Sequence, residues 1–145
     1  MAVTRRASVS WTGDLARGQG SVTAESSGLF KDARVTWASR TERSDGKTSP
    51  EELLAAAHAS CFAMALSFGL GSAGTPPERI DVTATITFDV DGGFKVKSSA
   101  LEVNGKVPRI DAKAFQAAAE SAKENCAISR ALKGNVELSV KATLV

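Results

Sequence analysis

Two cysteines, Cys61 and Cys126, are the side chains of this sequence best suited to nucleophilic or redox chemistry. A free thiol, with a pKa of about 8.5, is only a few per cent ionised at neutral pH, so a reactive cysteine needs a group that stabilises its anion. Lowering that pKa to about 6.5 takes about 2.7 kcal/mol. A helix dipole supplies at most about 1 kcal/mol in the end turns, whereas a guanidinium about 4 Å away supplies about 4 kcal/mol at an effective dielectric constant of about 20. A reactive cysteine here therefore calls for a nearby arginine.

Arg40 and Glu51 are the candidates for this stabilising group. Arg40 comes shortly before the predicted helix that carries Cys61, and Glu51 lies in the first turn of that helix, where its carboxylate could orient a guanidinium through paired hydrogen bonds. Arg34 and Arg43 are nearby alternatives to Arg40. From sequence alone, it is equally reasonable that Glu51 only complements the helix dipole and that Arg40 is a solvated loop charge.

The order in which the two cysteines act stays open at this point. Cys61 is expected about three turns into its helix, whereas Cys126 is expected at the start of a short helix, where backbone amides favour a thiolate. Cys126 therefore rivals Cys61 as the nucleophile, and two buried, inert cysteines are the alternative.

His58, three residues before Cys61, also allows a Cys-His hydrolase. Because parallel side chains on one helix rarely align imidazole and sulfur, we favour a packed helix histidine.

Neither a metal site nor a cofactor is expected. A structural zinc site needs four nitrogen or sulfur ligands, usually in closely spaced pairs, and the cysteines are far apart with one histidine to join them.

The segment 69–74, Gly-Leu-Gly-Ser-Ala-Gly, matches the dinucleotide fingerprint G-x-G-x-x-G letter for letter. That motif works between a strand and the start of a helix, whereas here it follows a predicted helix. We therefore interpret it as a helix stop.

The strands are predicted by apolar and polar residues that alternate with a period of two. The clearest strand covers 80–90, and after the turn Asp91-Gly92-Gly93 the chain returns over 94–103. The C-terminal segment 136–144 repeats the pattern, and weaker alternation predicts three N-terminal strands, at 7–11, around Val22 and from Val35 to Trp37. The sequence therefore predicts about six strands.

Two longer helices and one short helix should accompany these strands. Ser49-Pro50-Glu51-Glu52 combines an N-cap, a proline at the first helical position and a capping-box glutamate. The helix that starts at Pro50 is apolar nearly all round, and since one sheet covers only one side, other helices or a second subunit must cover the rest. A second helix should run from Asp111 to Asn125, followed by a short one over 126–132. Strands and helices without regular βαβ alternation indicate a single α+β domain over 1–145.

Composition excludes several kinds of partner and location. Eighteen basic and sixteen acidic residues leave a net charge of +2 without long charge runs, so nucleic acid is not expected as a partner. The uncharged stretch 53–77 contains polar residues, glycines and prolines, and its continuous apolar part is shorter than the about 20 residues of a membrane span. The first ten residues lack an apolar signal region, and two cysteines are too few for a disulfide scaffold. We expect a cytoplasmic protein.

Three segments resemble a known family. Residues 50–66, PEELLAAAHASCFAMAL, closely resemble the signature helix of the OsmC/Ohr family of thiol peroxidases. Residues 126–129, CAIS, are similar to its second-cysteine motif, and Trp11-Thr12-Gly13 with the glycines at 18 and 20 is similar to the N-terminal strands of the OsmC branch. The sequence departs from the family in three places: Ala127 replaces the usual proline, Asn125 replaces a common glycine, and Thr41 replaces the usual aromatic residue after the arginine.

The resemblance implies a two-cysteine peroxidase for organic hydroperoxides, with hydrogen peroxide a poorer substrate. Cys61 falls on the peroxidatic position, which becomes a sulfenic acid, and Cys126 on the resolving position, which closes a disulfide with it. Arg40 falls near the thiolate-stabilising arginine and Glu51 on its carboxylate partner.

The resemblance also implies the partners and the assembly. The expected partners are an organic hydroperoxide, a dithiol reductant of lipoyl type and a second copy of the chain. The implied OsmC-like fold is an intertwined homodimer in which antiparallel sheets wrap two central helices. An apolar pocket, with Met64, Phe62 and Trp37 as candidate walls, would favour alkyl hydroperoxides. The alternative function is a non-enzymatic dimer that binds a small apolar ligand in the same cavity.

Overall fold

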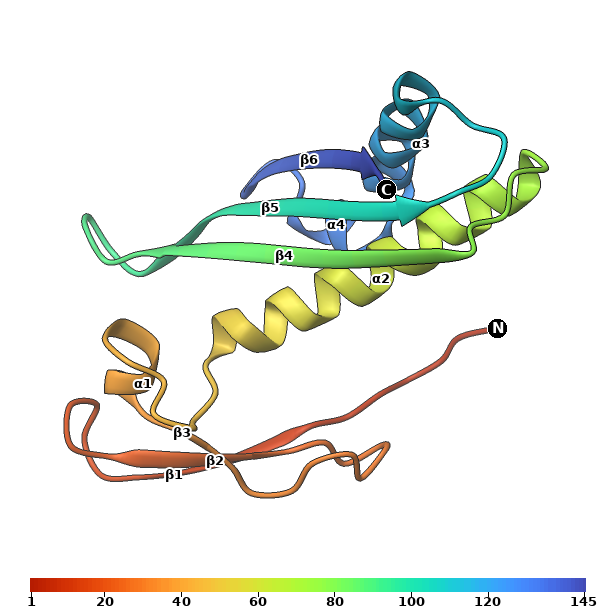
Figure 1. Cartoon of the computed structure of the whole chain (residues 1–145). Helices are drawn as coiled ribbons and strands as arrows, with labels where there is room; N and C mark the ends of the chain where they lie inside the picture. Colours follow the sequence, from red (N-terminus) through yellow and green to blue (C-terminus); the bar gives the residue numbers. More distant parts are fainter. The chain divides into compact units, whose positions relative to one another are not determined.

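The computed structural model describes residues 1–145 and places six strands in two separate three-stranded sheets (Figure 1). The chain divides into two compact units, residues 1–53 and 54–145. The first unit contains the sheet β1-β2-β3 and the second contains the sheet β4-β5-β6. With four helices besides, the predicted α+β class is confirmed.

The sheet of the first unit is an antiparallel meander. β1 (Ser8–Thr12) pairs with β2 (Gln19–Thr23), which pairs with β3 (Ala33–Val35). Gly20 in β2 lies opposite both Trp11 and Val35. A Cβ atom at Gly20 would lie 2.7 Å from Cε3 of Trp11, so only glycine lets the indole ring lie across the strand.

The third predicted strand ends earlier than expected. β3 stops at Val35, and Trp37 begins a short helix, α1 (Trp37–Thr41), so the strand prediction from Val35 to Trp37 is wrong at its end. The cause is a capping box: Thr36 Oγ1 accepts from the Ser39 amide at 3.0 Å, and Ser39 Oγ accepts from the Thr36 amide at 2.9 Å. These two bonds satisfy amides that would otherwise lack partners at the helix start. The chain therefore forms a helix at Trp37, although the weak alternation of apolar and polar residues predicted a strand there.

The long helix α2 (Pro50–Ser72) begins where the sequence predicts. The Ser49 hydroxyl accepts from the amide of Glu52 at 3.1 Å, which confirms the N-cap. In the expected capping box, the Glu52 carboxylate would accept from the amide of Ser49. It accepts instead from the hydroxyl of Thr48, the residue before Ser49, at 2.7 Å. The helix continues through two glycines of the G-x-G-x-x-G segment and stops before Gly74, which has a φ of +80°. This segment is therefore a helix end, as predicted.

By length and composition alone, α2 could cross a membrane, a property shared by the core helices of soluble proteins.

The sheet of the second unit is mixed. β4 (Arg79–Asp89) and β5 (Lys95–Lys106) form the predicted antiparallel hairpin through Gly92 and Gly93, both at positive φ. β6 (Glu137–Leu144) then pairs with β5 in parallel, which departs from the expected antiparallel sheets. The parallel pairing follows from the two helices that carry the chain back between these strands, α3 (Ala112–Asn125) and α4 (Ala127–Leu132).

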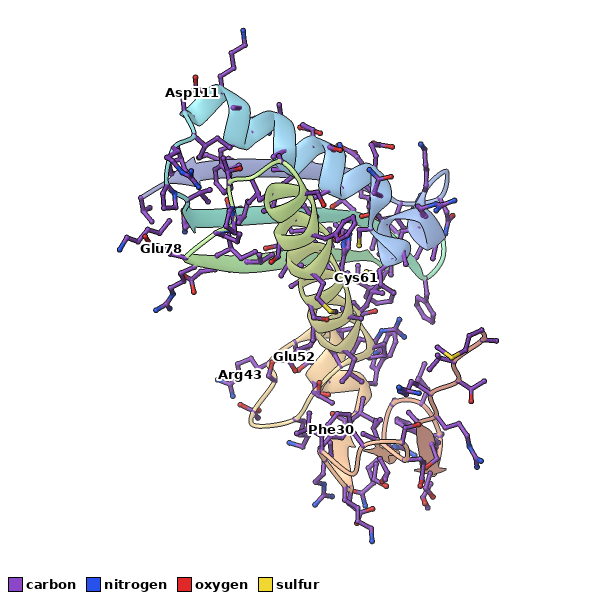
Figure 2. All side chains as sticks on the ribbon, turned by 90° about the vertical axis from the view of Figure 1, so that its right-hand side faces the viewer. Phe30, Arg43, Glu52, Cys61, Glu78 and Asp111 are labelled. Atoms are coloured by element: carbon purple, nitrogen blue, oxygen red, sulfur yellow. The ribbon has the colours of Figure 1, made fainter.

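Both helices α2 and α3 pack on this sheet through one hydrophobic core. Asp111, at the start of α3 (Figure 2), caps that helix by accepting from the Ala114 amide at 2.7 Å. Phe115, one turn on, is fully buried against β5, and a Cβ atom at Gly105 would collide with its ring. The other core residues come from α2, β5, α3 and the following turns: Phe62, Leu66, Leu70, Leu101, Val103, Val107, Ala119, Ala122 and Cys126.

Candidate active site

The second unit brings the two cysteines together. Cys61 is half-buried on α2 (Figure 2), and Cys126 is 1% exposed and is the single residue between α3 and α4. Its extended backbone, with φ −63° and ψ 127°, turns the chain from one helix into the next. The thiols of Cys61 and Cys126 lie close enough for each to shift the pKa of the other. Two thiols far apart in sequence are thus neighbours in the fold.

The surroundings of Cys61 favour its thiolate. Burial alone would raise the pKa of Cys61, but hydrogen bonds from the Ile128 amide, the Cys126 thiol and the Ala127 amide outweigh burial and hold the pKa below its usual value. Such bonds favour the charged form because they donate to it directly. The amides at the start of α4, which the sequence assigned to Cys126, therefore act on Cys61 as well as on Cys126.

The surroundings of Cys126 favour its neutral thiol instead. Burial raises the pKa of Cys126, and the Ser129 amide, the Ser129 hydroxyl and the Ile128 amide offset this only in part, while the bond to Cys61 adds to the rise. Cys126 is therefore a neutral thiol next to an easily ionised one. Local sequence reasoning missed this difference because the donors to Cys61 come from a helix more than sixty residues further along the chain.

Arg40 and Glu51 meet in the first unit. Arg40 Nε donates to both oxygens of the Glu51 carboxylate at 3.0 and 3.2 Å, and its Nη2 donates to Oε1 at 2.8 Å. The Glu51 side chain is only 11% exposed, so water competes little for this pair. The Arg40 guanidinium also lies 5.9 Å from the ring centroid of Trp37, a cation–π contact.

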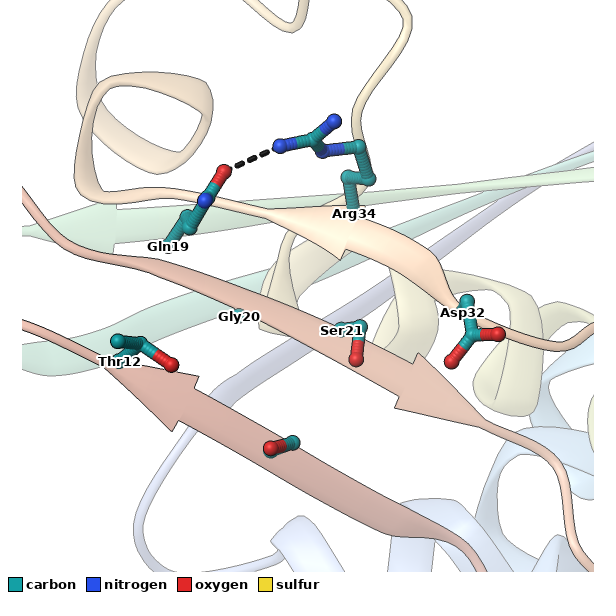
Figure 3. Close-up of a pocket in the computed structure, with 7 residues that line it drawn as sticks. Thr12, Gln19, Gly20, Ser21, Asp32 and Arg34 are labelled. Atoms are coloured by element: carbon teal, nitrogen blue, oxygen red, sulfur yellow. Dashed lines mark hydrogen bonds between the residues drawn. The ribbon is translucent and has the colours of Figure 1, made fainter.

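The two alternative arginines are engaged elsewhere. The Arg34 guanidinium donates to Gln19 Oε1 beside a polar pocket of about 310 Å³ on the sheet of the first unit (Figure 3). Arg43 is 85% exposed and approaches only Asp45, at 3.9 Å. Among the three arginines, Arg40 alone is held by a buried carboxylate. Because Arg40 belongs to the first unit and the cysteines to the second, its approach to Cys61 stays a prediction.

His58 is a packed helix histidine, as expected. It is fully buried, and its ring nitrogens bond two serines: Nδ1 lies 2.6 Å from Ser99 Oγ and Nε2 lies 2.8 Å from Ser129 Oγ. Burial lowers the pKa of His58, so the ring is neutral at pH 7. Since both nitrogens are occupied, neither takes a proton directly from Cys61. No three His, Cys, Asp or Glu side chains converge on a point that could hold a metal ion.

An apolar cavity of about 670 Å³ lies between α2 and α3. Ala65, one turn beyond Cys61, and Asn125, next to Cys126, are among its walls. The predicted pocket wall Phe62 is instead a core residue with no exposed surface, and Met64 is 68% exposed. The remaining walls of the cavity are Phe68, Gly69, Ala73, Ala118, Ser121 and Ala122. A cavity of this lining suits an alkyl or aryl group.

Comparison with known proteins gives a consistent result. Residues 43–141 match the family model described as OsmC-like protein. The chain is 42% identical over 139 residues to peroxiredoxin OsmC of Escherichia coli, covering 95% of this chain and 96% of the relative. It is 31% identical over 99 residues to organic hydroperoxide resistance protein-like 2 of Staphylococcus epidermidis, covering 66% of this chain and 68% of the relative. The crystal structure of organic hydroperoxide resistance protein OhrB of Bacillus subtilis superposes with a TM-score of 0.75 at 26% identity, covering 95% and 98% of the two chains.

Proposed function

Because the chain belongs to the OsmC-like protein family, we propose that it is a thiol peroxidase that reduces organic hydroperoxides to alcohols. Its Escherichia coli relative is named a peroxiredoxin, and relatives from Staphylococcus epidermidis and Bacillus subtilis are named for resistance to organic hydroperoxides. The observation that carries the proposal is the cysteine pair. An easily ionised thiol, Cys61, lies beside a buried neutral one, Cys126.

In the first step, the Cys61 thiolate attacks the distal oxygen of the hydroperoxide. A sulfur–oxygen bond forms, the oxygen–oxygen bond breaks, and the alkoxide takes up a proton and leaves as an alcohol. Cys61 becomes a sulfenic acid. The amides of Ala127 and Ile128 stabilise the attacking thiolate. Arg40, oriented by Glu51, is the residue that we propose to add positive charge to this site.

In the second step, the Cys126 thiol attacks the sulfur of the sulfenic acid. The disulfide bond forms, the sulfur–oxygen bond breaks, and the hydroxyl group leaves with the thiol proton as water. Because the two thiols are already neighbours in the reduced protein, we expect disulfide closure to need little movement. An external dithiol, of lipoyl type, then exchanges with the disulfide and restores both thiols.

The apolar cavity between α2 and α3 accounts for a preference for organic hydroperoxides. An alkyl or aryl group leaves water when it enters such a cavity. This transfer contributes about 25 cal/mol of favourable binding free energy for each Å² of apolar surface buried. Hydrogen peroxide has no apolar group and gains nothing from the cavity. The enzyme should therefore have a lower KM for cumene hydroperoxide than for hydrogen peroxide.

We infer that the working protein is a cytoplasmic homodimer in which residues 1–145 act as one functional domain. α2 leaves Met64 68% and Phe68 77% exposed, and this apolar surface is the natural place for a second copy. In the cytoplasm the thiols stay reduced between turnovers. Sedimentation of the wild type and of Phe68→Lys tests the dimer, because a charge at this position should convert it to a monomer.

The experiment that tests the function is a thiol titration before and after one equivalent of cumene hydroperoxide. The peroxidase loses both thiols, gains one intramolecular disulfide and releases one equivalent of alcohol. Cys61→Ser should release no alcohol. A protein that only binds apolar ligands would keep both thiols and leave the hydroperoxide intact, which would contradict the proposal.

A further inference from the structure

A chain of buried hydrogen bonds leads through the core of the second unit to Cys126. Ser99 on β5 bonds Nδ1 of His58 at 2.6 Å, and Nε2 of His58 bonds the hydroxyl of Ser129 on α4 at 2.8 Å. Ser129 follows Cys126 by three residues, and its side chain lies close enough to lower the pKa of the Cys126 thiol. Ser99 and His58 have no exposed surface, and Ser129 is 2% exposed. The chain joins three elements and ends at one of the two cysteines.

His58 lies on the apolar, core-facing side of α2, where packing alone would favour an apolar residue. His58, Phe62, Leu66 and Leu70 recur every four residues and are all buried, so they form one row that faces the core. An apolar side chain would continue this row without polar groups to satisfy. Burying an imidazole and two hydroxyl groups is costly unless each is hydrogen-bonded, and replacing such a set with apolar groups is often neutral or stabilising. Stability alone therefore does not account for the network.

We propose that His58 is a positioning residue for disulfide closure: acting through Ser129, it aims a hydroxyl donor at the sulfur of Cys126 as Cys126 attacks the sulfenic acid on Cys61. This inference rests on the proposed peroxidase function and concerns its second step only. Ser129 contacts the reacting sulfur, whereas His58 acts through Ser129.

The direction of the hydrogen bonds explains how the network works. When Nε2 of the neutral ring carries the proton, the Ser99 hydroxyl donates to Nδ1 and Nε2 donates to Ser129 Oγ. The Ser129 proton is then free to point at Cys126. Negative charge grows on Cys126 as its proton leaves with the departing hydroxyl group as water, and the Ser129 hydroxyl stabilises that charge. This help matters because Cys126 is buried and its thiolate is otherwise poorly solvated.

His58→Gln and His58→Asn form a matched pair that tests this role. Each places an amide in the same buried site, but Gln reaches the position of Nε2, beside Ser129, and Asn reaches that of Nδ1, beside Ser99. Reduced protein is mixed with one equivalent of cumene hydroperoxide and quenched at intervals. Dimedone traps the sulfenic acid and mass spectrometry counts disulfides, so the two steps are timed separately.

The inference predicts that both variants form the sulfenic acid at the wild-type rate within about twofold. His58→Asn should close the disulfide about tenfold more slowly or worse, the effect of losing one hydrogen bond to a charged group. His58→Gln should stay close to wild type. With excess hydroperoxide, the longer-lived sulfenic acid of His58→Asn should be overoxidised to sulfinic acid. Equal closure rates in the two variants, or equal slowing of both steps, would overturn the inference.

Ser129→Ala and Ser99→Ala provide a second pair should the histidine variants fail to fold. Each removes one buried hydroxyl that bonds His58, so their losses of stability should be similar, but only Ser129 contacts Cys126. Ser129→Ala should slow closure about tenfold and Ser99→Ala much less. Equal slowing would overturn the inference. A wild-type protein that forms no disulfide would overturn the proposed function, and this inference with it, whereas normal wild-type closure with indistinguishable variants would overturn the inference alone.

Discussion

Cys61 and Cys126 are neighbours in the second unit, yet their environments shift their pKa values in opposite directions, down for Cys61 and up for Cys126. The arrangement follows from the one-residue connection between α3 and α4, which places Cys126 in the core and directs the first amides of α4 at Cys61. A pair of equal thiols could react with peroxide in either order. This pair has a preferred nucleophile and a preferred resolving thiol.

The first prediction concerns the pH at which each thiol reacts. Alkylation by iodoacetamide follows the thiolate fraction, so Cys61 should reach half its maximal rate below a pH of about 8.5 and Cys126 above it. Peptide mass spectrometry resolves the two sites in one sample. In denaturant both should react like ordinary cysteines, which serves as the control. A lower midpoint for Cys126 than for Cys61 would reverse the assigned roles.

The second prediction concerns Arg40. Arg40→Lys keeps the positive charge but loses the paired hydrogen bonds to Glu51, because an ammonium group cannot reproduce the guanidinium fork. We expect kcat/KM for cumene hydroperoxide to fall by about tenfold to a hundredfold. Arg43→Lys is the matched control, since Arg43 is 85% exposed, and its activity should not change. Equal activities of the two variants would remove Arg40 from the mechanism.

The third prediction concerns His58 and acid stability. Burial lowers the pKa of His58, so below a pH of about 6.5 the unfolded chain binds a proton that the folded chain does not. The contribution of His58 to stability is therefore complete above that pH and is lost as the pH falls below it, by at most about 1.4 kcal/mol per pH unit. Urea unfolding of the reduced protein at several pH values should show this loss, and His58→Gln should show less of it. Identical pH dependence in both proteins would contradict a buried neutral histidine.

Much of the fold is predictable because its signals are local. The alternation through 80–90, the cap at Ser49 and the start of a helix at Asp111 each depend on neighbours in sequence, and the structure confirms all three. The parallel pairing of β6 with β5 depends on residues nearly forty positions apart, and sequence reasoning missed it. The site shows the same division: the cysteines are recognisable by type, but the donors to Cys61 are set by tertiary packing.

The last prediction concerns Ala127, which stands where the family resemblance leads one to expect proline. A proline has no N–H, so Ala127 gives Cys61 an amide donor that a proline at this position would not provide. Ala127→Pro should fold normally, because proline is favoured at the first position of a helix and Cys126 already has the extended backbone, with ψ 127°, that a following proline requires.

Loss of the Ala127 donor should make Cys61 harder to ionise. In Ala127→Pro, the midpoint of Cys61 alkylation should move to higher pH, and the first peroxidase step at pH 7 should slow by up to about tenfold, the effect of one hydrogen bond to a charged sulfur. Ala127→Gly keeps the N–H and is the matched control for removing the methyl group. If the two variants shared one midpoint, the Ala127 amide would have no part in stabilising the thiolate, and the Ile128 amide and the Cys126 thiol would be left as its donors in the second unit.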